Sequence, residues 1–243
     1  MRDKAADEEA ERALLGLGLL PGDRHYRAYV GPPEDYDLIA AMTFGLLVAL
    51  GLRQHHMLLD VGCGSLRVAR LLIPYLNPGN YFGIEPNRWL VEEGIERETG
   101  ADLLRIKRPT FVFADSARDL AADVRFDFIV AQSVFSHTGP DLLRRWIEEL
   151  APRLKPSGAL AATFLPDARD HEQPGWFYPD CVKYTPQTLE RIAGGAGLRF
   201  ALLDWRHPRQ QWALWARPDY DLAAVVDRPL DWNTALERHS KPA

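Results

Sequence analysis

The 243-residue sequence contains only two cysteines, too few for a disulfide framework. It also lacks an apolar run near the roughly 20 residues that a membrane-spanning helix needs. Basic residues are not in excess: 29 Lys and Arg stand against 34 Asp and Glu, a net charge of −5, which argues against a nucleic-acid partner. The first residues are charged and do not resemble a signal peptide, so we expect a cytoplasmic protein.

The most informative stretch is residues 58–67, which read Leu-Leu-Asp-Val-Gly-Cys-Gly-Ser-Leu-Arg. An apolar strand leads to Asp60, a turn with two glycines follows, and a helical pattern comes next. Glycine is used where the backbone turns with positive φ or a ligand approaches closely. The N–H groups at the start of a helix attract negatively charged groups. This pattern predicts a turn that holds the polar end of a nucleotide-like ligand.

Three later apolar strands also end in polar residues. The strand at 80–85 ends at Glu85, the strand at 110–114 is followed by Asp115, and the strand at 126–132 leads into Gln132 and Ser133. The carboxyl ends of parallel strands meet at one edge of a sheet. The four strands therefore predict one binding crevice.

With these motifs in this order, the chain resembles the class I S-adenosylmethionine (SAM)-dependent methyltransferases over residues 58–218. Residues 81–89 and 132–139 look most like bacterial enzymes that act on small molecules or glycans. The resemblance implies an α/β fold with SAM as cofactor: a Rossmann-like doubly wound sheet of seven strands, mostly parallel with an antiparallel closing hairpin, and helices on both faces. One departure is Leu66, which stands where the family usually has a third glycine and would place a bulkier side chain beside the ligand.

The resemblance also implies which residues bind the cofactor. The N–H groups of the glycine turn would face its carboxylate, and Asp60 would hold its ammonium group or orient the turn. Glu85 would accept hydrogen bonds from the ribose hydroxyls, and Asp115 would accept one from the adenine amine. The expected cofactor-binding residues are Asp60, Gly62, Cys63, Gly64, Ser65, Glu85, Pro86, Asp115, Ser116, Gln132 and Ser133.

For catalysis, His137 is the candidate general base because it follows the fourth strand and histidine titrates near neutral pH. It could instead cap the helix at Asp141 or shape the pocket. Aromatic side chains could contact the acceptor or could simply pack in the core; these candidates are Tyr26, Tyr29, Trp176, Tyr178 and Trp205, together with His207 on the predicted closing hairpin. No metal site is expected, because the His and Cys residues lack ligand spacing.

The expected organisation is an N-terminal helical and irregular segment (1–56), a SAM-binding domain (57–218) with an irregular insert at 166–185, and a loosely packed tail (219–243). Predicted helices cover 1–20, 37–51, 66–76, 88–98, 141–154 and 186–196, and predicted strands cover 57–61, 80–85, 110–114, 126–132, 159–165, 198–205 and 211–216.

The predicted function is methyl transfer to an oxygen or nitrogen atom of a small molecule or glycan. Two alternatives stay open at this point: a SAM-binding protein that transfers nothing, and an NAD-dependent oxidoreductase. The second requires Gly-x-Gly-x-x-Gly, where this chain has Arg67 in place of the last glycine. The acceptor and the oligomeric state cannot be read from the sequence.

Overall fold

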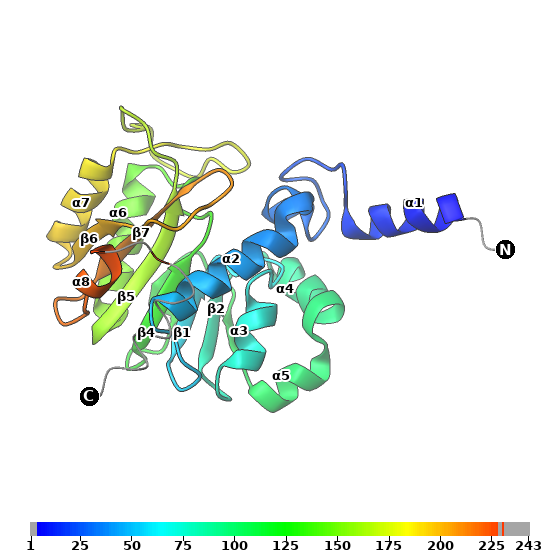
Figure 1. Ribbon diagram of the computed structural model, residues 1–243, viewed down its shortest axis with the longest axis horizontal. Helices are drawn as coiled ribbons and strands as arrows, with labels where there is room; N and C mark the ends of the chain where they lie inside the picture. The colour runs from blue at the N-terminus through cyan, green and yellow to red at the C-terminus, as the bar shows by residue number, and fades with distance from the viewer. Residues whose placement is uncertain (1–3, 228–229, 231–243) are drawn as a thin grey trace.

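A mixed β-sheet forms the centre of the molecule in this computed structural model, which describes residues 4–227 and residue 230. Within those residues the sheet has seven strands: β1 (Leu58–Val61), β2 (Tyr81–Ile84), β3 (Thr110–Val112), β4 (Phe126–Ala131), β5 (Leu154–Phe164), β6 (Arg199–Leu202) and β7 (Gln211–Ala216). Their order is β3-β2-β1-β4-β5-β7-β6 (Figure 1). β1 to β5 pair in parallel, and β7 is antiparallel to both β5 and β6. The predicted fold class is therefore confirmed.

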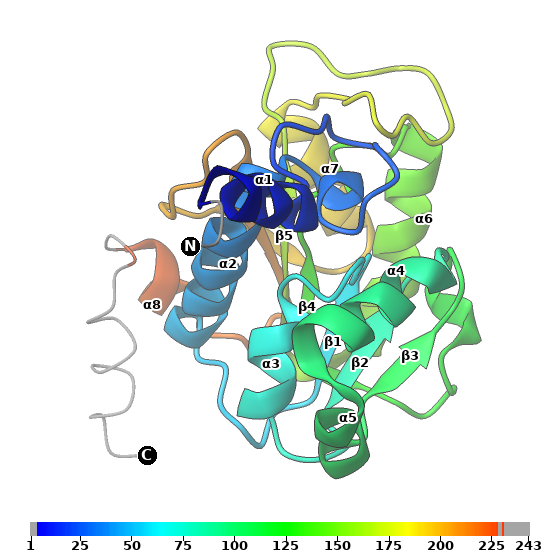
Figure 2. The ribbon, with the colours of Figure 1, turned by 90° about the vertical axis from the view of Figure 1, so that its right-hand side faces the viewer.

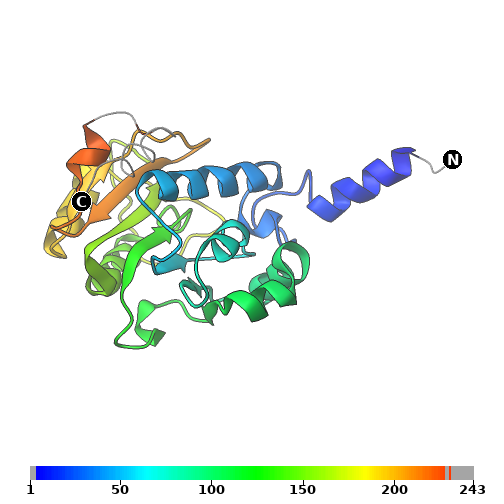
Figure 3. The same cartoon turned by 60° about the horizontal axis from the view of Figure 1, so that its bottom comes forward.

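Helices cover both faces of this sheet. On one face lie α2 (Tyr36–Ala49), α3 (Ala69–Tyr75) and α4 (Arg88–Gly94), and on the other lie α6 (Pro140–Leu150) and α7 (Pro186–Gly195) (Figures 1 and 2). A π-helical turn at Ile95–Thr99 joins α4 to α5 (Ala101–Lys107). The first helix, α1 (Lys4–Leu15), extends away from the sheet (Figure 3).

The alternating direction of side chains along each strand divides the core into two hydrophobic clusters. Leu58 and Leu59 are neighbours on β1 and both fully buried, yet they belong to opposite clusters. The same holds on β7, where Trp212 packs on the α2 and α3 side and Trp215 on the α6 and α7 side. Burying one large apolar side chain contributes about 1.5–3 kcal/mol, so the two clusters together hold both helical layers on the sheet.

The helix after the glycine turn begins later than predicted, at Ala69 instead of residue 66. Leu66 has a φ of 62°, the left-handed region that interrupts a right-handed helix. Its side chain is fully buried in the cluster under α2 and α3, so the expectation that it lies beside the ligand is wrong. Gly94 makes this packing feasible, because a Cβ there would lie 2.5 Å from the carbonyl oxygen of Ser65.

Other boundaries also differ from the prediction. β5 begins at Leu154, earlier than the predicted residue 159, because an irregular register opposite Phe126 extends the pairing. The tail is not loosely packed where it is described: Tyr220 is buried and donates a hydrogen bond to the carbonyl of Leu50 at 2.9 Å, and a short helix, α8 (Ala223–Val226), follows. Residues 1–3 of the predicted first helix, and residues 228–229 and 231–243 of the predicted tail, lie outside the described residues.

The boundaries at 56/57 and 218/219 stay a prediction, although α2 and Tyr220 share one hydrophobic cluster with the sheet. Across the part of the chain that the structure describes, no helix is both long and apolar enough to cross a bilayer.

Candidate functional site

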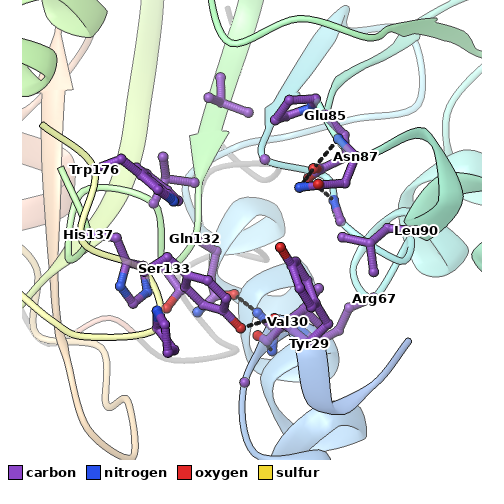
Figure 4. A pocket seen from close by; sticks show the side chains of 18 of the residues that line it. Tyr29, Val30, Arg67, Glu85, Asn87, Leu90, Gln132, Ser133, His137 and Trp176 are labelled. Atoms are coloured by element: carbon purple, nitrogen blue, oxygen red, sulfur yellow. Dashed lines mark hydrogen bonds between the residues drawn. The ribbon is translucent and has the colours of Figure 1, made fainter. Parts of the chain in front are cut away.

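A cavity of about 550 Å³ lies at the carboxyl ends of β1, β2 and β4. These strands flank the point where the strand order reverses, the usual ligand site of an open α/β sheet. Glu85 and Asn87 lie on one side of the pocket, and His137 and Trp176 lie on the other (Figure 4). Of the expected site residues, those that line the cavity are Tyr29, Gly62, Gly64, Glu85, Pro86, Asp115, Gln132, Ser133, His137, Trp176 and Tyr178.

Glu85, at the end of β2, is buried and holds the turn and the following loop together. Its Oε2 accepts the N–H of Gly64 at 3.1 Å, and its Oε1 accepts both the N–H and the side-chain Nδ2 of Asn87, each at 2.9 Å. Burial raises the pKa of Glu85, and these hydrogen bonds oppose the rise. A carboxylate has about four acceptor positions, so Glu85 keeps acceptor capacity for a ligand.

The glycine turn differs from the expectation in its hydrogen bonds. The N–H groups of Gly62 and Cys63 both donate to the carbonyl of Ile84, at 2.8 and 3.1 Å, and that of Gly64 donates to Glu85. The prediction that the N–H groups of Gly62, Cys63 and Gly64 face a cofactor carboxylate is therefore wrong, because the carbonyl of Ile84 and the carboxylate of Glu85 accept their hydrogen bonds. Ser65 does not reach the cavity either: it is fully buried, and the hydroxyl of Tyr36 donates to its carbonyl oxygen at 2.9 Å.

Cys63 and Asp60 do not line the cavity, and their side chains pack against strand β2. The Cys63 side chain packs against Gly83 of β2. The Asp60 carboxylate accepts the Tyr81 hydroxyl at 2.9 Å, and burial raises its pKa to about 7. Neither side chain lines the cavity. The position of Asp60 therefore fits the expectation that it orients the turn, and not the expectation that it holds the ammonium group of the cofactor.

Beyond β3, Asp115 and Ser116 point to different surroundings. Asp115 lines the cavity, and its carbonyl oxygen accepts a hydrogen bond from Arg145 at 2.8 Å. Ser116 instead donates to the Glu149 carboxylate at 2.8 Å and does not line the cavity. Sequence proximity alone had placed Ser116 in the site.

His137 is buried, and its ring has a defined hydrogen-bonded orientation. Its Nδ1 lies 2.7 Å from the carbonyl oxygen of Asp180, which can only accept, so Nδ1 carries the hydrogen and Nε2 keeps a lone pair when the ring is neutral. Burial lowers the pKa of His137. The alternative in which His137 caps the next helix is wrong, because Gly139 occupies the N-cap position of α6 without any side-chain cap. The ring can therefore accept a proton near neutral pH.

Aromatic side chains form a wall next to His137. The rings of Tyr178 and Trp176 lie 4.9 and 5.7 Å from that of His137, centroid to centroid. Tyr29 packs against Tyr178 at 5.4 Å and against Trp89 at 5.2 Å, and the Tyr178 hydroxyl donates to the carbonyl of Tyr29. The rings of Trp176 and Tyr178 are stacked at 29°, and that of Tyr29 is tilted by 46° to Tyr178, so aromatic rings line the cavity beside His137.

Two of the expected aromatic residues lie elsewhere. Tyr26 is buried among charged side chains, donating to Glu98 at 3.0 Å and accepting from Arg27 at 2.9 Å. Trp205 donates its indole N–H to the carbonyl of Met42 at 3.1 Å. Neither lines the cavity, and both have structural partners, so we do not assign them an acceptor contact.

Sequence reasoning missed several cavity residues, above all Arg67, whereas it had named His207 as a possible acceptor contact. Arg67 is buried and donates to the carbonyl of Val30 at 2.9 Å and to the side-chain oxygen of Gln132. His207 comes from the loop between β6 and β7, and burial together with the nearby Arg209 and Arg67 lowers its pKa to about 4. The position of Arg67 directly after the turn was the available signal. The missed residues include Asn87, Leu90, Arg209 and Gln210.

Within residues 4–227 and residue 230, no group of three or more His, Cys, Asp or Glu side chains is arranged to hold a metal ion.

Comparison with known proteins agrees with this geometry. Residues 59–160 match the model of a methyltransferase domain. The fold is similar to that of magnesium protoporphyrin IX methyltransferase from Synechocystis PCC 6803 with bound SAM, with a TM-score of 0.59 and 17% identity over 88% of this chain and 92% of that chain. It is also similar to the CcbJ methyltransferase from Streptomyces caelestis (TM-score 0.57, 17% identity, 77% and 91% covered).

A further similar structure is the glycopeptide N-methyltransferase MtfA in complex with S-adenosyl-L-homocysteine (TM-score 0.54, 14% identity, 73% and 87% covered). At these identities the likeness concerns the fold, including the sheet order and the layers of helices described above.

Proposed function

We propose that the chain is a class I SAM-dependent methyltransferase that methylates an oxygen or nitrogen atom of a small molecule, a proposal supported by its domain match and its fold. The observation that carries this proposal is a single cavity that holds both Glu85 and His137. Its volume of about 550 Å³ is within the range of roughly 300–1,000 Å³ typical of small-ligand sites.

The residues present fit the cofactor. Glu85 is a buried acceptor with one of its about four acceptor positions left for a ribose hydroxyl, and apolar side chains such as Ile84 and Leu90 line the cavity beside it. We assign Glu85 to the ribose and Asp115 to the adenine amine. In this proposal Gln132 and Ser133, after β4, face the amino-acid end of the cofactor. Gly62 and Gly64 line the cavity between β1 and α3.

When bound, SAM supplies an electrophilic methyl group. The chain contributes position: Tyr29, Trp176 and Tyr178 hold a planar acceptor, which brings the two partners to reactive distance. His137 contributes a proton acceptor at Nε2, since Nδ1 is committed to the carbonyl of Asp180. As the acceptor oxygen or nitrogen gains the methyl group, its proton passes to this nitrogen and then to solvent.

The proposal is tested by two measurements on the full chain. Calorimetry should detect binding of S-adenosyl-L-homocysteine with a Kd in the micromolar range, roughly −7 to −8 kcal/mol, and no binding of NADH. Incubation with isotopically labelled SAM and a fractionated extract of the source cells should then yield a labelled product of low mass. Binding without any transfer would indicate a SAM-binding protein that is not an enzyme, and binding of NADH alone would overturn the proposal.

A further inference from the structure

Three arginines surround the ring of the buried Tyr36, and they differ in their ionic partners. The guanidinium carbons of Arg27, Arg70 and Arg67 lie 4.5, 5.3 and 6.0 Å from the ring centroid. Arg27 and Arg70 both form ion pairs with Asp37 and Glu98. Arg67 contacts no carboxylate among the described residues; its partners are the carbonyl of Val30 and the amide oxygen of Gln132.

Arg67 is also the member of this group that lines the cavity, as Figure 4 shows beside Tyr29 and Val30. A buried charge without an opposite charge is costly, and burial lowers the pKa of Arg67 to about 10. The nearby charges compensate only in part: Asp60 raises the pKa of Arg67, whereas Arg209 adds a second positive charge and lowers it.

The other expected anion receptor of this cavity is absent. The N–H groups of Gly62, Cys63 and Gly64 are bonded within the protein, and the short helix α3 begins only at Ala69. The other cavity arginines already lie near carboxylates. Arg209 is paired with Asp35, and Arg145 lies 3.8 Å from the Asp115 carboxylate.

We propose that Arg67 is the anion receptor of this cavity and that its ligand is a carboxylate. A guanidinium has five N–H donors, and two are used here, so three remain. A planar carboxylate can accept two of them as a bidentate pair of hydrogen bonds. Two ligands can bring that carboxylate: the amino-acid end of the cofactor, which adjoins Gln132 in the proposed function, or an acidic acceptor. The first source rests on the proposed function, and the experiment separates the two.

The first arm compares two ligands that share adenosine and sulfur. S-adenosyl-L-homocysteine carries the carboxylate, and 5′-methylthioadenosine lacks the amino-acid end. If the cofactor supplies the carboxylate, Arg67→Met should weaken S-adenosyl-L-homocysteine about 10- to 100-fold by calorimetry and leave 5′-methylthioadenosine unchanged. Arg67→Lys should recover part of the loss, because it keeps the charge without the planar donor pair.

The matched control is Arg70→Met. Arg70 stacks on the same Tyr36 ring but does not line the cavity, so the ratio of the two affinities should stay as in the parent protein. Unchanged binding of 5′-methylthioadenosine by the Arg67 variants shows that the site has folded.

The second arm uses benzoate as a carboxylate probe on the protein loaded with S-adenosyl-L-homocysteine. If the acceptor supplies the carboxylate, millimolar benzoate should raise the melting temperature of the parent protein and not that of Arg67→Met. The affinities of Arg67→Met for S-adenosyl-L-homocysteine and 5′-methylthioadenosine should then equal those of the parent protein. The inference is overturned if Arg67→Met weakens both adenosine ligands equally, or if it changes neither their binding nor the benzoate effect. If the parent protein binds neither adenosine ligand, the proposed function itself has failed.

Discussion

At the scale of single residues, burial displaces the pKa values of the cavity groups in opposite directions. It raises the pKa of Glu85, and it lowers those of His137 and His207. In each case the displacement favours the uncharged form, as expected in a poorly solvated site. The hydrogen bonds from Asn87 and Gly64 lower the pKa of Glu85 and so oppose the effect of burial. They favour the carboxylate form, which accepts hydrogen bonds from hydroxyl groups.

The first prediction concerns Glu85→Gln, which keeps the shape of the side chain and removes its charge. Affinity for SAM should fall about 10-fold or more, because hydrogen bonds to a charged group are worth roughly 1.5–3 kcal/mol. Calorimetry measures the loss. The harsher Glu85→Ala should in addition lower thermal stability, since it leaves the buried N–H of Gly64 without its partner. Unchanged affinity in Glu85→Gln would remove Glu85 from the ribose site.

The second prediction concerns His137→Gln. Without the base the rate should fall about 10²- to 10⁴-fold, while SAM affinity stays within a few-fold. Because the base acts unprotonated and burial lowers its pKa, the parent rate should hold to a pH below the ordinary histidine value of 6.5 and then decline. The variant should lose that decline. A joint collapse of rate and affinity would show that His137 only shapes the pocket.

At the scale of elements, three segments from distant parts of the chain close the cavity. Residues 29–32 precede α2, residues 176–181 belong to the insert, and residues 207–210 join β6 to β7. They are linked to one another and to the sheet through three side chains. The Tyr178 hydroxyl reaches the carbonyl of Tyr29, Arg209 pairs with Asp35, and Gln210 donates to Ser133 at 2.9 Å.

The insert is irregular, as predicted, but it is anchored at its end. The N–H of Val182 donates to the carbonyl of Ser136 at 2.7 Å, and the fully buried Tyr184 donates its hydroxyl to the carbonyl of Thr138 at 2.7 Å. These bonds hold the backbone beside His137 and position the aromatic wall.

The third prediction tests this closure with Tyr178→Phe. Losing the hydroxyl removes its bond to Tyr29, so amide hydrogen exchange over residues 28–32 should become faster in the free protein, whereas the amide of Val182 should stay protected. Tyr184→Phe is the matched control. It removes the buried hydrogen bond to the carbonyl of Thr138, and it should lower the melting temperature without changing exchange at residues 28–32. Identical exchange in the parent protein and Tyr178→Phe would show that this bond does not hold residues 28–32 over the cavity.

At the scale of the whole molecule, the two hydrophobic clusters fix both helical layers, and buried or half-buried histidines make stability depend on pH. His207 has a folded pKa of about 4 against an ordinary value of 6.5. The unfolded chain therefore takes up a proton at a pH where the folded chain does not. Stability from this group is complete above about pH 6.5 and is lost as the pH falls towards 4. His56 and His137 act in the same direction, because burial lowers the pKa of each.

The fourth prediction follows from that sign. Between pH 7 and pH 4.5 the melting temperature of the parent protein should decline, and His207→Gln should decline less. Part of the decline should remain in the variant, since His56 and His137 still titrate. Thermal unfolding by circular dichroism at half-unit pH intervals measures both curves, and parallel curves would exclude His207 as a source of the pH dependence.

The sequence by itself determined the sheet and the edge that carries the cavity. Alternating and continuous apolar runs place β1, β2 and β4, and polar residues directly after them must lie at one edge because parallel strands end together. For this reason Glu85, Gln132 and His137 were predicted correctly as residues of one cavity. The resemblance to class I methyltransferases followed from the same local motifs and agrees with the domain match and the fold.

Tertiary structure alone decided which polar groups face the cavity. The amides of Gly62 and Cys63 are taken by Ile84 of the neighbouring strand, and the hydroxyl of Ser116 is taken by Glu149 of α6. Arg67 contacts a loop 37 residues earlier and a strand end 65 residues later, with no carboxylate among the described residues at its guanidinium. A donor or a charge is satisfied by whatever the fold brings within about 3 Å. Those partners are distant in the chain, so local sequence patterns do not encode which groups remain for a ligand.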